Sequence, residues 1–151
     1  MSDTTLKPET EERGRVTVTA KITNLEDLWR ADRGEIGQED VRSIDVDDAV
    51  VDTGCIGLAM PESMVSELGL RKVRTKTVRT TNGSREAPIY QAARLDLQER
   101  DCIVEVYGLP EDLPVLIGQL ALESMDWVVD MKNQRLIGNP EHDGEWVHEM
   151  Y

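Results

Sequence analysis

The stretch that most constrains the fold is residues 71–97, in which β-branched residues flank the dipeptide Asn82-Gly83 on both sides. β-Branched side chains favour strands because they pack well on a pleated surface. Asn-Gly is a strong signal for a two-residue hairpin turn, in which both central positions need positive φ. The sequence therefore predicts a long β-hairpin with its tip at Asn82-Gly83.

Further strands are predicted along most of the chain. Apolar residues alternate with polar ones over 16–22, which indicates a half-buried strand, and the apolar run Ala49–Val51 is typical of a strand buried on both faces. A third extended region, 93–108, reads as a hairpin that turns at 98–101. Short strands are also expected in the segments 55–61, 113–118, 126–131 and 135–138.

Only two short helices are expected. Residues 61–68 begin with Pro61 in the first turn and end before Gly69, a typical C-terminal cap, and residues 119–125 form the second. The segment 25–40 is predicted to be a loop or loose hairpin, because it has two glycines and no persistent apolar stripe. A mainly β chain of this kind, with many short strands and tight turns, favours a closed or partly closed small barrel.

The 151 residues fit one domain, which we expect over 14–140. The polar residues 1–13 are predicted to form a disordered acidic tail, and residues 141–151 an acidic C-terminal tail. No signal peptide and no apolar run of membrane-spanning length is present, which predicts a cytoplasmic protein with no membrane partner. Cys55 and Cys102 are then expected to be reduced thiols, although the sequence leaves a disulfide between them open.

The net charge of −13 argues against nucleic acid as a partner, because phosphates would be repelled. Two interpretations of the charge remain. The first, which we favour, is simply solubility. The second is a preference for basic or extended polar peptides, for which the sequence gives little support.

Asp52 is the first candidate functional residue, because it directly follows the apolar run that ends at Val51. An aspartate at this position is usually a turn former, whose side chain bonds nearby backbone N–H groups. Asp45, Asp47, Asp48 and Asp130 are rival acids, but the first three precede the buried run and are expected to be exposed. Asp130 lies on a late strand and is expected to face solvent or cap a turn.

Three segments in a fixed order make Asp52 more than a turn former. They are Val50-Val51-Asp52-Thr53-Gly54, the hairpin at Asn82-Gly83, and Leu116-Ile117-Gly118 with the helix that follows. This order, which covers about residues 14–140, resembles the retropepsin-like aspartic proteases, and more closely their small cellular and bacterial members than the viral ones. Two departures are visible: Cys55 follows the glycine where a small residue is usual, and Ile56 and Gln119 stand where the viral pattern has an ion pair.

The resemblance implies a retropepsin-like β-barrel and assigns roles to named residues. Asp52 would be the catalytic acid, with Thr53 and Gly54 supporting its loop. The hairpin tip would be a flap that closes over an extended peptide, and a second apolar segment would thread past the catalytic loop. The flap residues are Thr81, Asn82, Gly83 and Ser84, and the threading segment is Leu116, Ile117 and Gly118.

Hydrolysis by carboxylates needs one acid and one base beside a single water, and two carboxylates about 3 Å apart share one proton. This chain has a single Asp-Thr/Ser-Gly motif. The expected enzyme is therefore a homodimer in which Asp52 of each copy meets at a two-fold axis, with a peptide or protein as substrate and no metal or cofactor. The expected function is that of an aspartic endopeptidase.

Two alternatives to this enzyme stay open. The same fold would also suit a non-catalytic dimeric peptide-binding or scaffold module, or a monomer in which Asp52 never meets a partner. Cys55 as a nucleophile would need a nearby base, and both histidines are in the C-terminal tail. The tail residues His142, Asp143, Glu145 and His148 match no strong zinc pattern, so we expect no metal there, and Trp146 and Val147 are candidates for a dimer contact.

Overall fold

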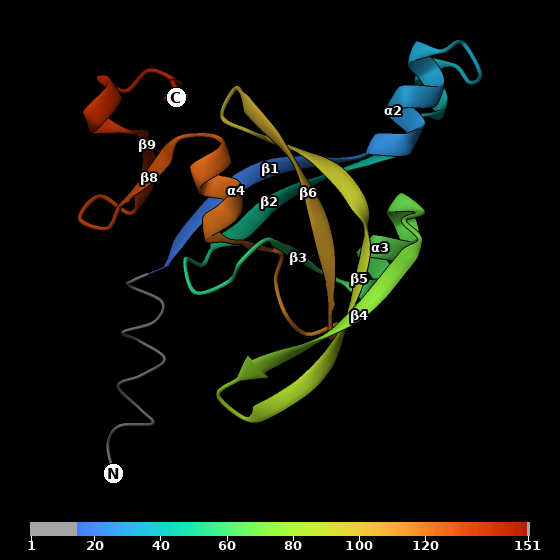
Figure 1. Cartoon of the computed structure of the whole chain (residues 1–151), viewed down its shortest axis with the longest axis horizontal. Helices are drawn as coiled ribbons and strands as arrows, with labels where there is room; N and C mark the ends of the chain where they lie inside the picture. Colours follow the sequence, from blue (N-terminus) through green and yellow to red (C-terminus); the bar gives the residue numbers. More distant parts are fainter. Residues whose placement is uncertain (1–14, 151) are drawn as a thin grey trace.

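The computed structural model describes residues 15–150, so the tail predicted over 1–13 lies outside the described residues. Two sheets and several short helices make up this part of the chain (Figure 1). In chain order the elements are β1 (Val16–Asn24), α2 (Leu25–Asp32), η1 (Gln38–Asp40), β2 (Ser43–Val51), β3 (Leu58–Pro61), α3 (Glu62–Leu68), β4 (Lys72–Thr80), β5 (Gly83–Leu97), β6 (Arg100–Leu109), β7 (Leu116–Ile117), α4 (Gln119–Ser124), β8 (Trp127–Asp130), β9 (Arg135–Gly138) and η2 (Pro140–His142).

The larger sheet closes on itself. Its strands follow the order β1-β2-β7-β3-β6-β5-β4, and an additional pairing of β1 with β5 joins six of them into a ring. β4 lies outside this ring and pairs only with β5, so the β4–β5 hairpin extends away from it, at the bottom of Figure 1. β8 and β9 form a separate two-stranded sheet. The expected mainly β fold is confirmed, and the expected barrel takes the form of this ring of six strands.

The core lies inside the ring. The alternation predicted over 16–22 is confirmed, because every second residue from Val16 to Ile22 is buried and the residues between them are exposed. Apolar residues from the other strands of the ring and from α3 and α4 complete the core; they include Met60, Leu68, Leu95, Val106, Ile117 and Leu122. Burial of apolar surface contributes about 25 cal/mol per Å², so this interior stabilises the ring on which the site is built.

The two expected helices are present as α3 and α4. Gly69 ends α3 in the left-handed region, with φ of 69°, as predicted for a C-terminal glycine. A third helix, α2, corrects the expected loop at its start. The side chain of Asn24 caps it by accepting a hydrogen bond from Asp27 N, and the carboxylate of Asp27 accepts from the backbone N–H and the guanidinium of Arg42.

The hairpin predicted at Asn82-Gly83 is present, but its tip is displaced by one residue. Thr80 pairs with Gly83, so the two central residues of the turn are Thr81 and Asn82. Gly83 has a positive φ of 108°, whereas the φ of Asn82 is not positive. The hydroxyl of Thr80 explains the shift, because it donates to Gly83 O at 2.8 Å and accepts from Asn82 N at 3.2 Å.

The expected hairpin that turns after residue 97 is also confirmed. β5 and β6 pair up to Leu97 and Arg100, and the two residues between them, Gln98 and Glu99, have φ of 49° and 69°. This is the backbone of a tight two-residue hairpin turn, formed here without glycine or asparagine at either position. The strong pairing of β5 with β6 holds the left-handed conformation in place.

The C-terminal segment packs against the ring through Arg100. This buried guanidinium donates to the backbone carbonyls of Met125, Asp126 and Gly144 at 2.7–2.9 Å. It also stacks on the ring of Trp127, with a distance of 4.0 Å to the centroid. The domain boundary drawn at residue 140 stays a prediction, but Gly144, which follows η2, is held against the start of β6 by its hydrogen bond from Arg100.

Both cysteines are free thiols, so the disulfide left open by the sequence does not form in this structure. Cys102 is buried in the core, as expected. Within residues 15–150, no helix combines the length and apolar character needed to cross a membrane.

Candidate active site

Asp52 lies directly after β2, and its backbone and side chain shape the loop that follows. Its N–H donates to Ile117 O at 2.9 Å, and its carboxylate oxygen Oδ1 accepts from Gly54 N, also at 2.9 Å. Its carbonyl oxygen accepts from Cys55 N at 3.0 Å. The carboxylate therefore does form the turn, as an aspartate after a strand commonly does, and it remains partly exposed to solvent.

The segment Leu116-Ile117-Gly118 passes directly beside the Asp52 loop. β7 lies between β2 and β3, parallel to β2 and antiparallel to β3. Beyond it, Gly118 N donates to Gly57 O and Gln119 N donates to Cys55 O, each at 2.9 Å. Backbone hydrogen bonds to β7 and to the start of α4 therefore hold the loop at both of its ends.

Gly118 makes this close approach possible. A Cβ at Gly118 would lie 2.7 Å from Gly57 O and closer still to Cys55 O, distances that real Cβ atoms do not show. Gly118 itself is extended, with φ of −94°, so steric contact and not backbone strain requires the glycine.

A cavity of about 420 Å³ opens between the Asp52 loop and the β4–β5 hairpin. Of the residues predicted for the site, Asp52, Gly54 and Leu116 line it. Thr53 does not line it and is exposed, while Ile117 and Gly118 are buried behind it. The predicted flap residues Thr81–Ser84 are exposed at the tip, beyond the cavity, which the hairpin lines instead with residues 76–80, Arg85 and Ala87.

The hairpin side chains that line this cavity were missed at the sequence level. Lys76, Arg79 and Arg85 are cations, and Tyr107 adds an aromatic side chain from β6. The sequence contains a signal that could have identified them: side chains alternate between the two faces along each strand, so residues two apart share a face. The one-residue displacement of the turn changes the partner of each residue by two positions, so that Val78 pairs with Arg85, but the same residues share a face as in the predicted hairpin.

Asp52 is the single carboxylate among the described residues that line the cavity. The rival acids lie elsewhere: Asp45, Asp47 and Asp48 are exposed on β2, as expected. Asp130 caps the β8–β9 turn, as expected, by accepting from the backbone and side-chain amides of Asn133.

Cys55 shares the cavity with Asp52 but is a poor nucleophile. Burial, and then the nearby charge of Asp52, raise the pKa of the Cys55 thiol. Its Sγ lies 3.5 Å from Gly57 O, within reach of a weak hydrogen bond, and no described histidine lines the cavity. A thiolate mechanism therefore lacks both an activated sulfur and a base.

The tail histidine His142 has a different partner. Its Nδ1 lies 2.6 Å from Asp126 Oδ2, and this contact raises the pKa of His142. Asp126 is largely buried, which by itself raises the pKa of a carboxyl; its hydrogen bonds from His142, Asn139 and Val147 outweigh this and lower the pKa of Asp126 to about 2. Within residues 15–150, no group of three or more histidine, cysteine or acidic side chains is placed to hold a metal ion.

A second, shallower groove adjoins the Asp52 loop on its other side. Three large apolar side chains line it and are more than half exposed: Ile56 at 60%, Ile103 at 57% and Leu120 at 56%. Leu120 N donates to Ile56 O at 2.9 Å, so the start of α4 and the Asp52 loop present this surface together.

Known protein families and solved structures each include a match to this chain. A family model described as aspartyl protease matches residues 33–121, a segment that contains Asp52, the β4–β5 hairpin and Gly118. Among solved structures, the solution structure of the simian foamy virus (mac) protease is 18% identical, with a TM-score of 0.44, and the match covers 71% of this chain and 91% of that one. No curated protein sequence matches the chain.

Proposed function

The chain belongs to the aspartyl protease family, and from this premise we propose that it is an aspartic endopeptidase that acts as a homodimer. The observation that carries the proposal is the cavity beside the hairpin, in which Asp52 is the single carboxylate among the described residues. Acid–base hydrolysis of a peptide bond needs a second acid. A second copy of the chain would supply it.

In the proposed mechanism the two Asp52 carboxylates share one proton across a two-fold axis. The ionised member removes a proton from a water molecule, which attacks the scissile carbonyl carbon. The protonated member donates a hydrogen bond to the carbonyl oxygen, and the tetrahedral diol then collapses as the amine leaves. The pKa values that govern this reaction belong to the pair of carboxylates and not to one of them.

The surface around Asp52 supports dimerisation there. Thr53 and Gly54 are exposed at the turn, and Ile56 and Leu120 continue the same surface with large exposed apolar side chains. Contiguous exposed apolar side chains commonly mark an interaction site. We propose that Thr53 braces the two loops across the axis, and that Gly54 allows a substrate backbone to approach Asp52.

The cavity and the hairpin support a peptide substrate. We propose that an extended peptide lies between the Asp52 loop and the β4–β5 hairpin, with Thr81–Ser84 as the flap tip that closes over it. Leu116 lines the floor of this space, while Ile117 and Gly118 hold the loop from behind. A cytoplasmic location is part of the same proposal and stays a prediction from the sequence.

The decisive experiment compares Asp52→Asn with Asp47→Asn on a peptide library at mildly acidic pH. Both changes remove one carboxylate, but Asp47 is exposed in the middle of β2 and outside the cavity. We expect Asp52→Asn to abolish cleavage and to leave the dimer intact in sedimentation, whereas Asp47→Asn keeps both.

Three outcomes contradict the proposal. Cleavage by the Asp52→Asn protein would exclude Asp52 as the catalytic acid. A wild-type protein that binds peptides but cleaves none at any pH would be the non-catalytic peptide-binding module, and a monomer at high concentration would exclude a shared pair of acids.

A further inference from the structure

The β4–β5 hairpin lines the cavity with three cations, and two of them, Lys76 and Arg85, share one face of the hairpin. Lys76 pairs with Ala87 and Val78 with Arg85, and directly opposed residues of an antiparallel pair share one face of the sheet. Because side chains two residues apart also share a face, these four residues form one surface. All four line the cavity beside Asp52, and Ala87 is only 2% exposed, so this is the face that turns inward.

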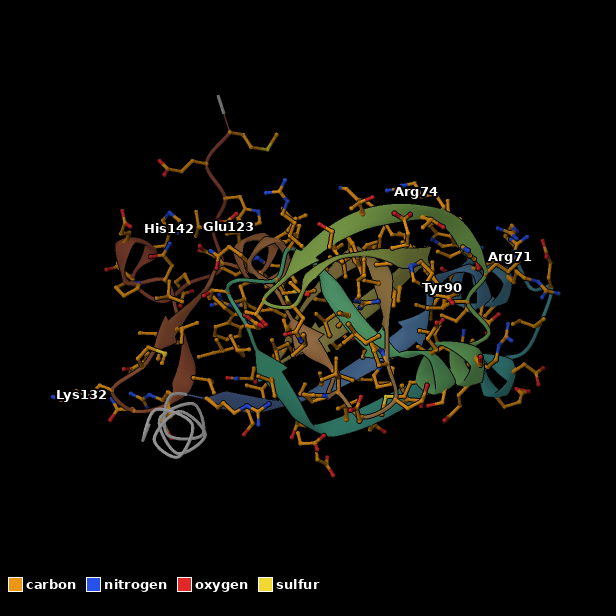
Figure 2. The ribbon with its side chains drawn as sticks, turned by 90° about the horizontal axis from the view of Figure 1, so that it is seen from below. Arg71, Arg74, Tyr90, Glu123, Lys132 and His142 are labelled. Carbon is orange, nitrogen blue, oxygen red and sulfur yellow. The ribbon has the colours of Figure 1, made fainter. Side chains whose placement is uncertain are left out.

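Neither inner cation is neutralised within residues 15–150. Arg85 Nη1 makes one long contact, 3.5 Å to the backbone carbonyl of Glu86, and Lys76 bonds no carboxylate. The Glu86 side chain is on the opposite face, where it accepts from Thr77 Oγ1 at 2.8 Å. By contrast Arg74, which Figure 2 labels on the same hairpin, donates to Glu105 Oε2 at 2.8 Å.

This local charge is opposite in sign to that of the whole chain, which is −13. Lys76 and Arg85 are diagonal neighbours whose mutual repulsion is relieved by an anion between them. The apolar walls of the cavity, including Val78, Ala87 and Leu109, reduce screening by water and so strengthen the attraction for an anion. The cavity therefore favours a negatively charged group beside an apolar one.

We propose that Lys76 and Arg85 bind the carboxylate of an acidic side chain in the peptide, so that preferred substrates carry Asp or Glu next to the bond that is cleaved. This inference rests on the proposed function, since it places the peptide in the cavity beside Asp52. It also replaces the preference for basic peptides that the net charge alone suggested. Lys76 and Arg85 are specificity-determining residues and take no part in the proton transfers.

The first measurement is binding of matched peptides to the Asp52→Asn protein, which separates recognition from cleavage. The peptides are apolar octamers, acetylated and amidated so that no terminal charge remains, with one Glu, Gln or Lys moved through every position. At pH 6 and low salt we expect at least one position at which Glu binds roughly fivefold tighter than Gln, the upper range for a partly exposed ion pair. A free C-terminal carboxylate is tested in a parallel series without the amide.

Substitutions then assign the preference to the two cations. In Lys76→Gln/Arg85→Gln the Glu peptide is expected to bind no more tightly than the Gln peptide, and in Lys76→Glu/Arg85→Glu the Lys peptide is expected to bind best. Lys72→Gln is the matched control, because Lys72 is on the same strand but outside the cavity. The same Lys76 and Arg85 substitutions are also made in protein that keeps Asp52, and kcat/KM is measured for the same peptides. This second readout does not require the Asp52→Asn protein to fold.

Three results overturn the inference: equal binding of Glu and Gln peptides at every position, an equal loss in Lys72→Gln, or no binding in any series. A preference confined to the free C-terminal carboxylate also overturns it. Cleavage without charge preference would remove this inference and leave the endopeptidase. If the wild-type protein binds Glu peptides selectively but cleaves none, the charge preference stands and the proposed endopeptidase activity is excluded.

Discussion

At Asp52 a structural and a proposed catalytic role meet in one side chain. One carboxylate oxygen accepts from Gly54 N at 2.9 Å and fixes the turn, while the carboxylate also lines the cavity. An asparagine side chain retains an oxygen that can accept the same hydrogen bond. The loss of activity expected for Asp52→Asn is therefore separable from a loss of loop structure.

Gly118 gives a sharp test of the loop geometry. We expect Gly118→Ala to destabilise the protein by about 1–3 kcal/mol, the usual cost of overpacking, because its Cβ would meet backbone atoms of Cys55 and Gly57. Gly57→Ala is the matched control, since a Cβ there would make only ordinary contacts, the shortest 3.6 Å. The check is denaturant unfolding of both variants. Equal stability of the two would show that the loop moves freely away from Gly118.

Cys55 should be dispensable for catalysis. Burial and the charge of Asp52 raise the pKa of its thiol, so little thiolate is present at neutral pH. We expect Cys55→Ala to retain cleavage within a few fold, and wild-type Cys55 to react with iodoacetamide more slowly than a free thiol at pH 8. Loss of cleavage in Cys55→Ala, with the fold and dimer intact, would assign the sulfur a chemical role.

Among the elements, β6 holds the C-terminal segment through Arg100. Arg100→Lys keeps the charge but loses the planar fork that reaches three backbone carbonyls, including that of Gly144. We expect a loss of about 1–3 kcal/mol in unfolding free energy, because buried carbonyls lose their donors. Arg94→Lys on β5 is the control. The ion pair of Arg94 with Asp96 is partly exposed, so it contributes less than about 1 kcal/mol to the unfolding free energy. Similar losses in the two variants would contradict this role of Arg100.

The contact between η2 and Asp126 should depend on pH. The contact that raises the pKa of His142 stabilises the folded state fully below about pH 6.5. This contribution is lost as the pH rises through the pKa of His142 in the folded state. Asp126, whose pKa is lowered to about 2, contributes fully above its ordinary 3.8 and loses its contribution as pH falls toward 2. The pair is therefore strongest between about pH 4 and 6.5.

Amide exchange of residues 139–147, measured across this range, checks the expectation. Protection should be greatest near pH 5, after correction for the intrinsic exchange rate, and should fall above neutrality. His142→Asn removes the charge, and its protection should no longer vary with pH between 5 and 8. A wild-type profile that is flat over the same range would show that the ion pair does not hold the segment.

At the scale of the whole molecule, the proposed dimer depends on the apolar surface beside the Asp52 loop. Leu120→Glu on α4 should give a monomer without activity, because a charge would be buried in the interface. Met131→Glu is the control: Met131 is as exposed, at 55% against 56%, but it follows β8 and lines neither the cavity nor the groove beside the Asp52 loop. Sedimentation and cleavage are measured together, and a dimeric, active Leu120→Glu protein would place the interface elsewhere.

The sequence by itself determined the order of the parts. Alternation and apolar runs identified the strands that form the ring, and Pro61 with Gly69 marked the ends of α3, because these signals depend on local backbone preferences. The same local signals, together with the Asp-Thr-Gly and Leu-Ile-Gly segments, indicated the family that the family model then matched.

Helix α2 and the exact hairpin tip were beyond the sequence, for one physical reason. Both depend on a side chain that bonds a specific backbone group: Asn24 caps α2 by accepting from Asp27 N, and Thr80 shifts the turn through its hydroxyl. One such hydrogen bond stabilises a local structure by about 1 kcal/mol, which is enough to outweigh a weak backbone preference for another structure.

Only the tertiary structure decided which charges face Asp52. Lys76 and Arg85 share one face of the β4–β5 hairpin while Glu86 is on the opposite face, and packing of the hairpin beside the ring decides which face lines the cavity. Closure of the ring then brings β7 against the Asp52 loop, so that Gly118 has no room for a Cβ. Propensity acts within a few residues, whereas register and closure join residues far apart in the chain, and the cavity is made from those long-range pairings.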